Sequence, residues 1–190
     1  MNVLCFGSSN TYGYDPRSFL GDRLPADARW VDLLGKKSGW TMLNAGVNGR
    51  EIPRRDEEFE IVARLISRSQ PLHRMLIMTG LNDLLQGADV PTVISRLEAF
   101  LIGLPLPKEQ LVLIAPPPMT EGTWPVNTDL PERSLRFTGA CRDLAEKLDI
   151  PFVDTVDWDI ECMFDGVHFT EDGSRRFADR LWDALQTLSD

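Results

Sequence analysis

Short apolar runs separated by long polar and amphipathic stretches restrict the fold of this chain more than any other feature. Each run has the length of a strand, and its continuous apolar character is typical of a strand buried on both faces. The four clearest runs span residues 3–6, 41–43, 75–78 and 111–115, and a weaker fifth spans residues 151–153. These runs lie too far apart for hairpin connections, so the sequence predicts strands that pair in parallel through crossovers.

The stretches between the runs have the spacing of amphipathic helices, with apolar residues at positions i, i+3 and i+4. This spacing occurs around residues 30–34, 90–101, 135–148 and 174–188. Strands that alternate with helices predict an α/β fold with a five-stranded parallel sheet, right-handed crossovers and three α/β/α layers. A chain of 190 residues is about one domain long, and no linker or internal repeat divides it. We therefore expect a single domain over residues 1–190.

The composition of the chain is acidic, with 20 Lys and Arg against 29 Asp and Glu and a net charge of -9. This balance argues against nucleic acid or an anionic membrane as a partner and favours a small molecule. The cysteines Cys5, Cys141 and Cys162 form no C-x-x-C pair, so we expect neither a disulfide framework nor a metal site. The chain start lacks the pattern of a signal peptide, and no apolar stretch reaches the ~18 residues of a membrane span. We expect a cytoplasmic protein.

Polar residues follow the first two predicted strands, where ligands bind in open parallel sheets. Residues 7–13 read GSSNTYG, a turn into a helix that either presents a serine hydroxyl beside unpaired N–H groups or simply caps the helix. Residues 44–49 read NAGVNG, and the closing Asn-Gly pair favours a turn with positive φ. Such a turn either lets backbone N–H groups approach a ligand or is an ordinary loop.

Two further polar blocks follow the third strand and precede the last helix. Residues 79–83 read TGLND, where Asn82 either directs its amide into the crevice or caps a helix. In the block DGVH, Asp165 lies three residues before His168, so its carboxylate can orient one imidazole nitrogen while the other faces outward. Taken singly, each block also fits a structural role. Because the four blocks fall at predicted strand ends, their coincidence favours a catalytic site.

Together these blocks resemble the GDSL or SGNH hydrolase superfamily, which is named for Ser, Gly, Asn and His in four separated blocks. The matching segments are FGSSNTYG, NAGVNG, TGLND and DGVHFT, in the order and spacing of the family. The D-x-x-H pattern just before a terminal helix is the most specific of these marks. The chain is most similar to the compact bacterial branch related to short-chain arylesterases and acyltransferases, which implies a flavodoxin-like α/β fold.

The resemblance assigns a role to each matching residue. Ser9 is the expected nucleophile, His168 its general base and Asp165 the group that orients His168. The expected oxyanion hole consists of the backbone N–H groups of Ser9 and Gly49 and the side-chain amide of Asn82. The resemblance implies no metal and no cofactor.

The sequence departs from the family pattern around the nucleophile. Ser8 stands where the family usually has Asp, and Asn10 replaces the usual Leu. We expect the Ser8 hydroxyl to cap the following turn, and we rank Ser8 below Ser9 as nucleophile because its side chain should point elsewhere. Gly46 lies in the same block as Gly49, but the glycine of the family matches the position that closes NAGVNG.

The predicted activity is hydrolysis of small carboxylic esters, with short acyl or O-acetyl groups, through an acyl-serine intermediate. A thioesterase or an acyltransferase would use the same residues. Two rivals belong to other classes: a non-catalytic binding protein that keeps the fold, suggested by Ser8, and a phosphate binder that uses the turn at residues 7–13. The second rival lacks the G-x-x-x-x-G-K-[ST] pattern and a lysine in that turn.

Aromatic residues near the predicted site are candidates for the substrate pocket. Tyr12 and Tyr14 follow the nucleophile, and Trp124 lies in the aperiodic stretch 116–131. These rings either line the pocket or pack the loops onto the body of the domain. The same stretch could mediate self-association, so the sequence leaves the oligomeric state open.

Overall fold

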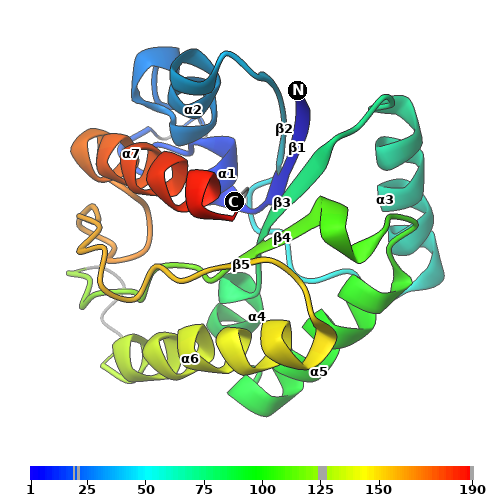
Figure 1. The fold of residues 1–190 in the computed structure, drawn as a ribbon. Coiled ribbons are helices and arrows are strands. Elements are labelled where there is room, and N and C mark those ends of the chain that lie inside the picture. Colours follow the sequence, from blue (N-terminus) through cyan, green and yellow to red (C-terminus); the bar gives the residue numbers. More distant parts are fainter. Residues whose placement is uncertain (19, 21, 124–127, 189–190) are drawn as a thin grey trace.

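The computed structural model describes residues 1–18, 20, 22–123 and 128–188. These residues contain one five-stranded parallel sheet with the strand order β2-β1-β3-β4-β5 (Figure 1). All five predicted strands are confirmed, and so is their parallel pairing. The strands are β1 (Asn2–Gly7), β2 (Thr41–Gly46), β3 (Arg74–Met78), β4 (Leu111–Ile114) and β5 (Phe152–Val153).

Helices form two outer layers, which confirms the predicted three-layer arrangement. The helices are α1 (Ser9–Tyr12), α2 (Trp30–Ser38), α3 (Asp56–Arg68), α4 (Leu81–Leu85), α5 (Val90–Gly103), α6 (Leu130–Leu148) and α7 (Glu171–Thr187), with short 3-10 turns at Ala26–Ala28 and Lys108–Gln110. Helices α2 and α7 cover one face of the sheet, and α3, α5 and α6 cover the other (Figure 1). Within the described part of the chain, no helix is long and apolar enough to cross a bilayer.

The ends of the helices follow from capping chemistry as well as from apolar spacing. Helix α7 begins at Glu171, three residues before the predicted start, because the Thr170 hydroxyl accepts a hydrogen bond from the Gly173 N–H. Helix α5 begins after Asp89, whose carboxylate accepts a hydrogen bond from the Thr92 N–H. The predicted start of α5 at residue 90 is therefore confirmed, whereas the cap of α7 lies outside the apolar stripe and periodicity alone placed that start too late.

The inner strand β1, which lies between β2 and β3, shows how the core is divided. Leu4 and Phe6 pack into the apolar cluster under α3, α5 and α6, whereas Val3 and Cys5 pack into the cluster under α2 and α7. All four side chains are buried, as the alternation of strand side chains between two covered faces requires. The faces of the sheet are therefore filled, and polar chemistry is left to the carboxyl ends of the strands.

A glycine at the end of β2 allows the first helix to pack directly against that end. A Cβ atom on Gly46 would lie 2.1 Å from the backbone nitrogen of Tyr12, so a side chain at this position would push α1 away. The Asn44 amide also donates a hydrogen bond of 2.8 Å to the Thr11 carbonyl. Through these contacts, the two sequence blocks that follow β1 and β2 meet at the same edge of the sheet.

Candidate active site

Ser9 is the first residue of α1, and a single residue, Ser8, separates it from the end of β1. Its side chain is largely buried, and its N–H lies in the first helical turn, where backbone N–H groups have no intrahelical acceptor. Ser8 occupies the N-cap position, but its hydroxyl makes no capping hydrogen bond. The expectation that Ser8 caps the turn is therefore wrong. The backbone of Ser8, with φ -100° and ψ -146°, departs from the extended conformation in which a capping hydroxyl reaches back to the helix.

The structure brings Ser9, His168 and Asp165 into one hydrogen-bonded series. The Nε2 atom of His168 lies 2.9 Å from the Ser9 Oγ, and its Nδ1 atom lies 2.5 Å from an Asp165 carboxylate oxygen. Ser9 and His168 are separated by 159 residues in the chain, so the fold rather than local sequence creates this contact. The order hydroxyl, imidazole, carboxylate is the one that a general-base mechanism at serine requires.

The Asp165 carboxylate is held by its own turn. Its second oxygen accepts hydrogen bonds from the backbone N–H groups of Val167 (2.9 Å) and His168 (3.0 Å). Burial by itself would raise the pKa of Asp165, but the hydrogen bonds from His168 and Val167 favour the charged form and keep the pKa below its usual value. Asp165 is therefore a charged acceptor at neutral pH that fixes the orientation of the imidazole.

Asn10, which departs from the family pattern, joins α1 to the segment around His168. Its amide nitrogen donates to the Val167 carbonyl (2.9 Å), and its amide oxygen accepts from the Phe169 N–H (3.1 Å). These two bonds attach the residues immediately before and after His168 to Asn10. Analysis of the sequence identified Asn10 only as a departure and missed this role. A polar residue directly after the predicted nucleophile, in place of an apolar one, was the available signal.

Asn82 lies in α4, directly after the end of β3, and its side chain turns toward the block that follows β2. The amide nitrogen donates a hydrogen bond of 2.9 Å to the backbone carbonyl of Arg50. An amide nitrogen carries two hydrogens, so one N–H is used to orient the group and the second is available to a ligand. The blocks around residues 49 and 82 are therefore joined, as the expected oxyanion hole requires.

Two glycines compete for the donor position in the block NAGVNG, and their surroundings differ. The N–H of Gly46 already donates to the Asn44 side-chain oxygen (2.9 Å). Gly49 is exposed, has φ +71°, and has nothing within 4 Å of the position of a Cβ atom. The arrangement therefore favours Gly49 over Gly46 as a group that a ligand can approach closely.

The buried carboxylate of Asp83, the residue after Asn82, also binds the segment that follows Gly49. Asp83 is fully buried, accepts a hydrogen bond of 2.9 Å from the Ile52 N–H, and forms an ion pair with Arg96 of α5 at 2.9 Å. The neighbouring residues Asn82 and Asp83 thus hold Arg50 and Ile52 at two adjacent points. Asp83 was not identified from the sequence, because the two donors that bond to its carboxylate, Ile52 and Arg96, belong to other segments of the chain.

The aromatic candidates for the substrate pocket separate in the structure. Tyr14 stands edge-on against the His168 ring, with a distance of 4.8 Å between ring centroids. The Tyr12 ring instead packs under the guanidinium of Arg23, 4.4 Å from its central carbon. Trp124 lies outside the described residues. Tyr14 therefore lies beside the series of Ser9, His168 and Asp165, and Tyr12 packs against a different partner.

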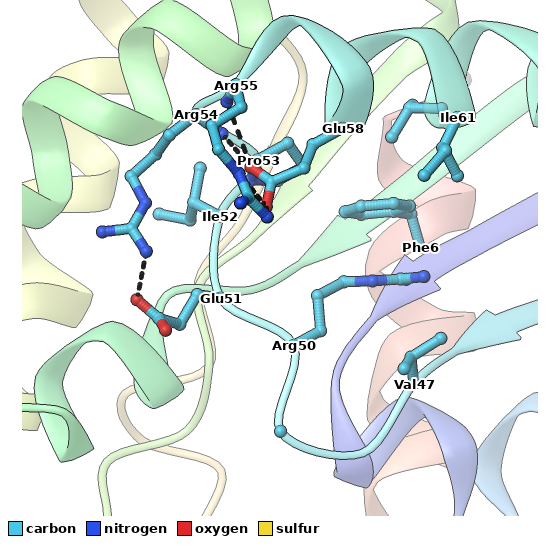
Figure 2. A pocket seen from close by; sticks show the side chains of 12 residues that line it. Phe6, Val47, Arg50, Glu51, Ile52, Pro53, Arg54, Arg55, Glu58 and Ile61 are labelled. Carbon is cyan, nitrogen blue, oxygen red and sulfur yellow. Dashed lines mark hydrogen bonds and ion pairs between the residues drawn. The ribbon is translucent and has the colours of Figure 1, made fainter.

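A pocket of about 760 Å³ lies beside Gly49, between the segment that follows β2 and helix α3 (Figure 2). It is lined by apolar side chains such as Val47 and Ile61 and by charged side chains from residues 50–58.

Within the part of the chain that the structure describes, no group of three or more His, Cys, Asp or Glu side chains is arranged to hold a metal ion.

A serine, a histidine and an aspartate in series at the carboxyl edge of a parallel sheet are typical of the serine hydrolase class. Residues 5–176 match the GDSL-like Lipase/Acylhydrolase family, and the chain belongs to this family. The resemblance found in the four sequence blocks is thereby confirmed. Membership supports a carboxylic ester hydrolase acting on a small-molecule ester. A search of curated protein sequences found no match to this chain.

Solved structures with the same fold match nearly the whole chain. The structure of Est24, a carbohydrate acetylesterase from Sinorhizobium meliloti, has 21% sequence identity and a TM-score of 0.83 and covers 98% of each chain. The M. smegmatis aryl esterase has 21% identity and a TM-score of 0.81, also with 98% of each chain covered. The lipase/acylhydrolase from Enterococcus faecalis has 20% identity and a TM-score of 0.74, with 97% of this chain and 95% of the other covered. These similarities establish the SGNH hydrolase fold.

Proposed function

We propose that this protein is a serine ester hydrolase that cleaves small carboxylic esters through an acyl intermediate on Ser9. The observation that carries the proposal is the series Ser9, His168, Asp165, with 2.9 Å from hydroxyl to imidazole and 2.5 Å from imidazole to carboxylate. This contact also argues against the two non-catalytic rivals, because neither a binding protein nor a phosphate site needs a histidine directed at that hydroxyl.

Acylation of Ser9 begins with proton transfer to neutral His168. The Ser9 oxygen attacks the ester carbonyl while the Nε2 atom of His168 accepts the hydroxyl proton, and the alcohol leaves with that proton. Asp165 accepts a hydrogen bond from Nδ1–H, which keeps that ring nitrogen protonated and leaves Nε2 free to accept the serine proton. The carboxylate also stabilises the imidazolium that forms. Water then attacks the acyl-serine by the same route, which releases the acid and regenerates Ser9.

The negative charge that develops on the carbonyl oxygen is assigned to three donors: the N–H groups of Ser9 and Gly49 and the free amide N–H of Asn82. The Asn82 amide is already oriented by its bond to the Arg50 carbonyl, so it needs no rearrangement when the charge appears. Donors that are fixed in advance lower the barrier more than water does, because water must reorganise around the new charge.

The proposed substrates carry short acyl or O-acetyl groups. Tyr14 stands against the His168 ring and occupies space next to the reacting atoms, which favours small groups. A carbohydrate acetylesterase and an aryl esterase are among the proteins with the same fold.

Thioester hydrolysis and acyl transfer to an alcohol use the same residues. The cytoplasmic location and the single domain over residues 1–190 stay predictions from the sequence.

Hydrolysis of 4-nitrophenyl acetate by matched serine variants tests the proposal. Ser9→Ala removes the nucleophile and should lower kcat by roughly 10⁴-fold or more. Ser8→Ala is the control, because it removes a hydroxyl of the same size from the adjacent position, where no capping bond is lost. On the active protein, a thioester is then compared with the ester as acyl donor, and an alcohol is compared with water as acyl acceptor. Equal activity of Ser9→Ala and the wild-type protein would contradict the proposal.

A further inference from the structure

The pocket beside Gly49 contains three arginines, and two of them are already neutralised. Arg54 forms an ion pair with Glu51 at 2.8 Å, and Arg55 forms one with Glu58 at 2.6 Å. Arg50 has no carboxylate partner among the residues that the structure describes. Figure 2 shows its guanidinium apart from the two pairs.

The Arg50 guanidinium is held in one orientation by three contacts. Its Nη1 atom donates to the backbone carbonyl of Gly7 (3.0 Å) and to that of Ala45. Its central carbon lies 4.2 Å from the centre of the Phe6 ring, so the planar group stacks on that ring (Figure 2). Gly7 is the last residue of β1, and Ala45 lies one residue before the end of β2, so these bonds fix the cation to the carboxyl ends of two paired strands.

The other edge of the same guanidinium is open. Neither Nε nor Nη2 has a hydrogen-bond acceptor in the described part of the chain, and neither is among its fully buried side-chain nitrogens without a partner. These donors therefore keep some accessible surface, and Arg50 is one of the residues that line the pocket. Burial of the group lowers the pKa of Arg50 to about 10, so it stays charged at neutral pH while it has lost much of its hydration. An anion in the pocket would offset that loss.

We propose that Arg50 forms a subsite for a carboxylate carried by the ester substrate, and this inference rests on the proposed function. The Nε and Nη2 atoms of a guanidinium match the two oxygens of a carboxylate and bind it through two parallel hydrogen bonds. Gly7, which Arg50 contacts, is two residues from Ser9, so at most ~7 Å of chain separates them. Gly49 lines the pocket and is also the proposed oxyanion donor. A substrate whose carbonyl is at Ser9 could therefore place a carboxylate at Arg50.

The carboxylate could belong to either half of the ester, and two pairs of substrates distinguish these sources. The acyl pair is the mono-4-nitrophenyl ester of adipic acid and 4-nitrophenyl hexanoate. The alcohol pair is 4-acetoxybenzoate and its neutral methyl ester. For each pair the quantity measured is the ratio of kcat/KM for the anionic ester to kcat/KM for the neutral ester. A ratio is used because Arg50 also contacts the turn that carries Ser9, and its loss can lower every rate together.

The wild-type protein should prefer the anionic member of one pair by roughly 10-fold to 100-fold, with the difference mainly in KM. Arg50→Met should bring that ratio to about 1, and Arg50→Lys should retain part of it, since a lysine keeps the charge but loses the fork. Arg64→Gln on α3 is the control: it removes one exposed positive charge outside the pocket and should leave the ratio unchanged.

Three outcomes would overturn the inference. The first is a wild-type ratio near 1 for both pairs, together with measurable hydrolysis of the neutral esters. This outcome is measured on the wild-type protein alone, so it does not depend on whether a variant folds. The second is an unchanged ratio in Arg50→Met. The third is stronger inhibition of hydrolysis of the anionic ester by inorganic phosphate than by adipate, which would assign the subsite to phosphate. Absence of hydrolysis with every ester would instead contradict the proposed function itself.

Discussion

The proposed proton-transfer group, Ser9 with His168 and Asp165, differs sharply from the proposed oxyanion group, Gly49 with Asn82. In the first group, the side chains bond to one another, and the turn that carries the imidazole is bonded to its own carboxylate. In the second, Gly49 is exposed and Asn82 uses one of its two amide N–H groups. The side chains of the first group already bond to one another, whereas the second group is held in place with N–H groups left free for a substrate.

The two groups are also supported in different ways. Asn10 joins helix α1 to the backbone on both sides of His168. The oxyanion group is held from below by the buried Asp83 and from the side by the Arg50 guanidinium, which binds the ends of β1 and β2. The first support fixes two side chains relative to each other, and the second fixes a loop beside an open pocket. Changes in the two groups should therefore have separable effects.

The largest effect within the proton-transfer group is expected from Asp165→Asn. An amide in place of the carboxylate disfavours the tautomer in which Nε2 accepts the Ser9 proton, so kcat should fall by about 10⁴-fold with little change in KM. Asp159→Asn is the control, because Asp159 is an almost fully exposed aspartate with positive φ, a conformation that Asn also tolerates. A loss of less than tenfold for Asp165→Asn would show that His168 needs no carboxylate.

Asn82→Ala tests the oxyanion group. Loss of one fixed donor should lower kcat by about 10²-fold to 10³-fold, with KM little changed, because the donor acts on charge present only in the transition state. Asn82→Asp keeps the size of the side chain but replaces the donor with an acceptor, and it should be at least as severe. Wild-type kcat in both variants, measured with 4-nitrophenyl acetate, would remove Asn82 from the site.

Asn10→Leu tests the brace that joins the two ends of the proton-transfer group, and it restores the residue usual in the family. The change removes two hydrogen bonds and leaves the Val167 carbonyl and the Phe169 N–H without these partners, at a cost of about 1–3 kcal/mol in the free energy of unfolding. We expect kcat to fall by roughly tenfold, as His168 loses its alignment with Ser9. Unchanged kcat and Tm would show that the brace is dispensable.

The smallest effect concerns stability in acid. The pKa of Asp165 is lower in the folded protein than in the unfolded chain, so its charged form stabilises the fold above about pH 4 and this contribution is lost as the pH falls further. The free energy of unfolding of the wild-type protein should therefore exceed that of Asp165→Asn by more at pH 7 than at pH 3. An equal difference at both pH values would contradict this account of the carboxylate.

The fold was largely predictable because it depends on side chains that repeat along the chain. The five strands are continuous apolar runs, and four of the helices carry a visible apolar stripe. Helix α3 was not among the predicted helices, although Phe59, Val62, Leu65 and Ile66 pack against the core from one side of it. Helices α1 and α4 are too short to show any period.

The site was predictable only in part, for a related reason. The positions of Ser9, Asn82, Asp165 and His168 could be proposed because each stands in a recognisable block. The supporting contacts could not be proposed, since Asn10, Arg50 and Asp83 each bond to a backbone group that lies more than 30 residues away or on another element. Backbone N–H and C=O groups are the same at nearly every residue, so the sequence does not indicate which of them a side chain will meet. Only the fold reveals that these side chains reach them.

Covalent labelling of the nucleophile tests the central claim most directly. The protein is incubated with a serine-reactive aryl phosphonate, digested, and analysed by peptide mass to locate the adduct. We predict one equivalent of label on Ser9, with labelling abolished in Ser9→Ala, slowed in Asp165→Asn and retained in Ser8→Ala. Label at another residue, or equal labelling of Ser9→Ala and the wild-type protein, would contradict the assignment of Ser9 as the nucleophile.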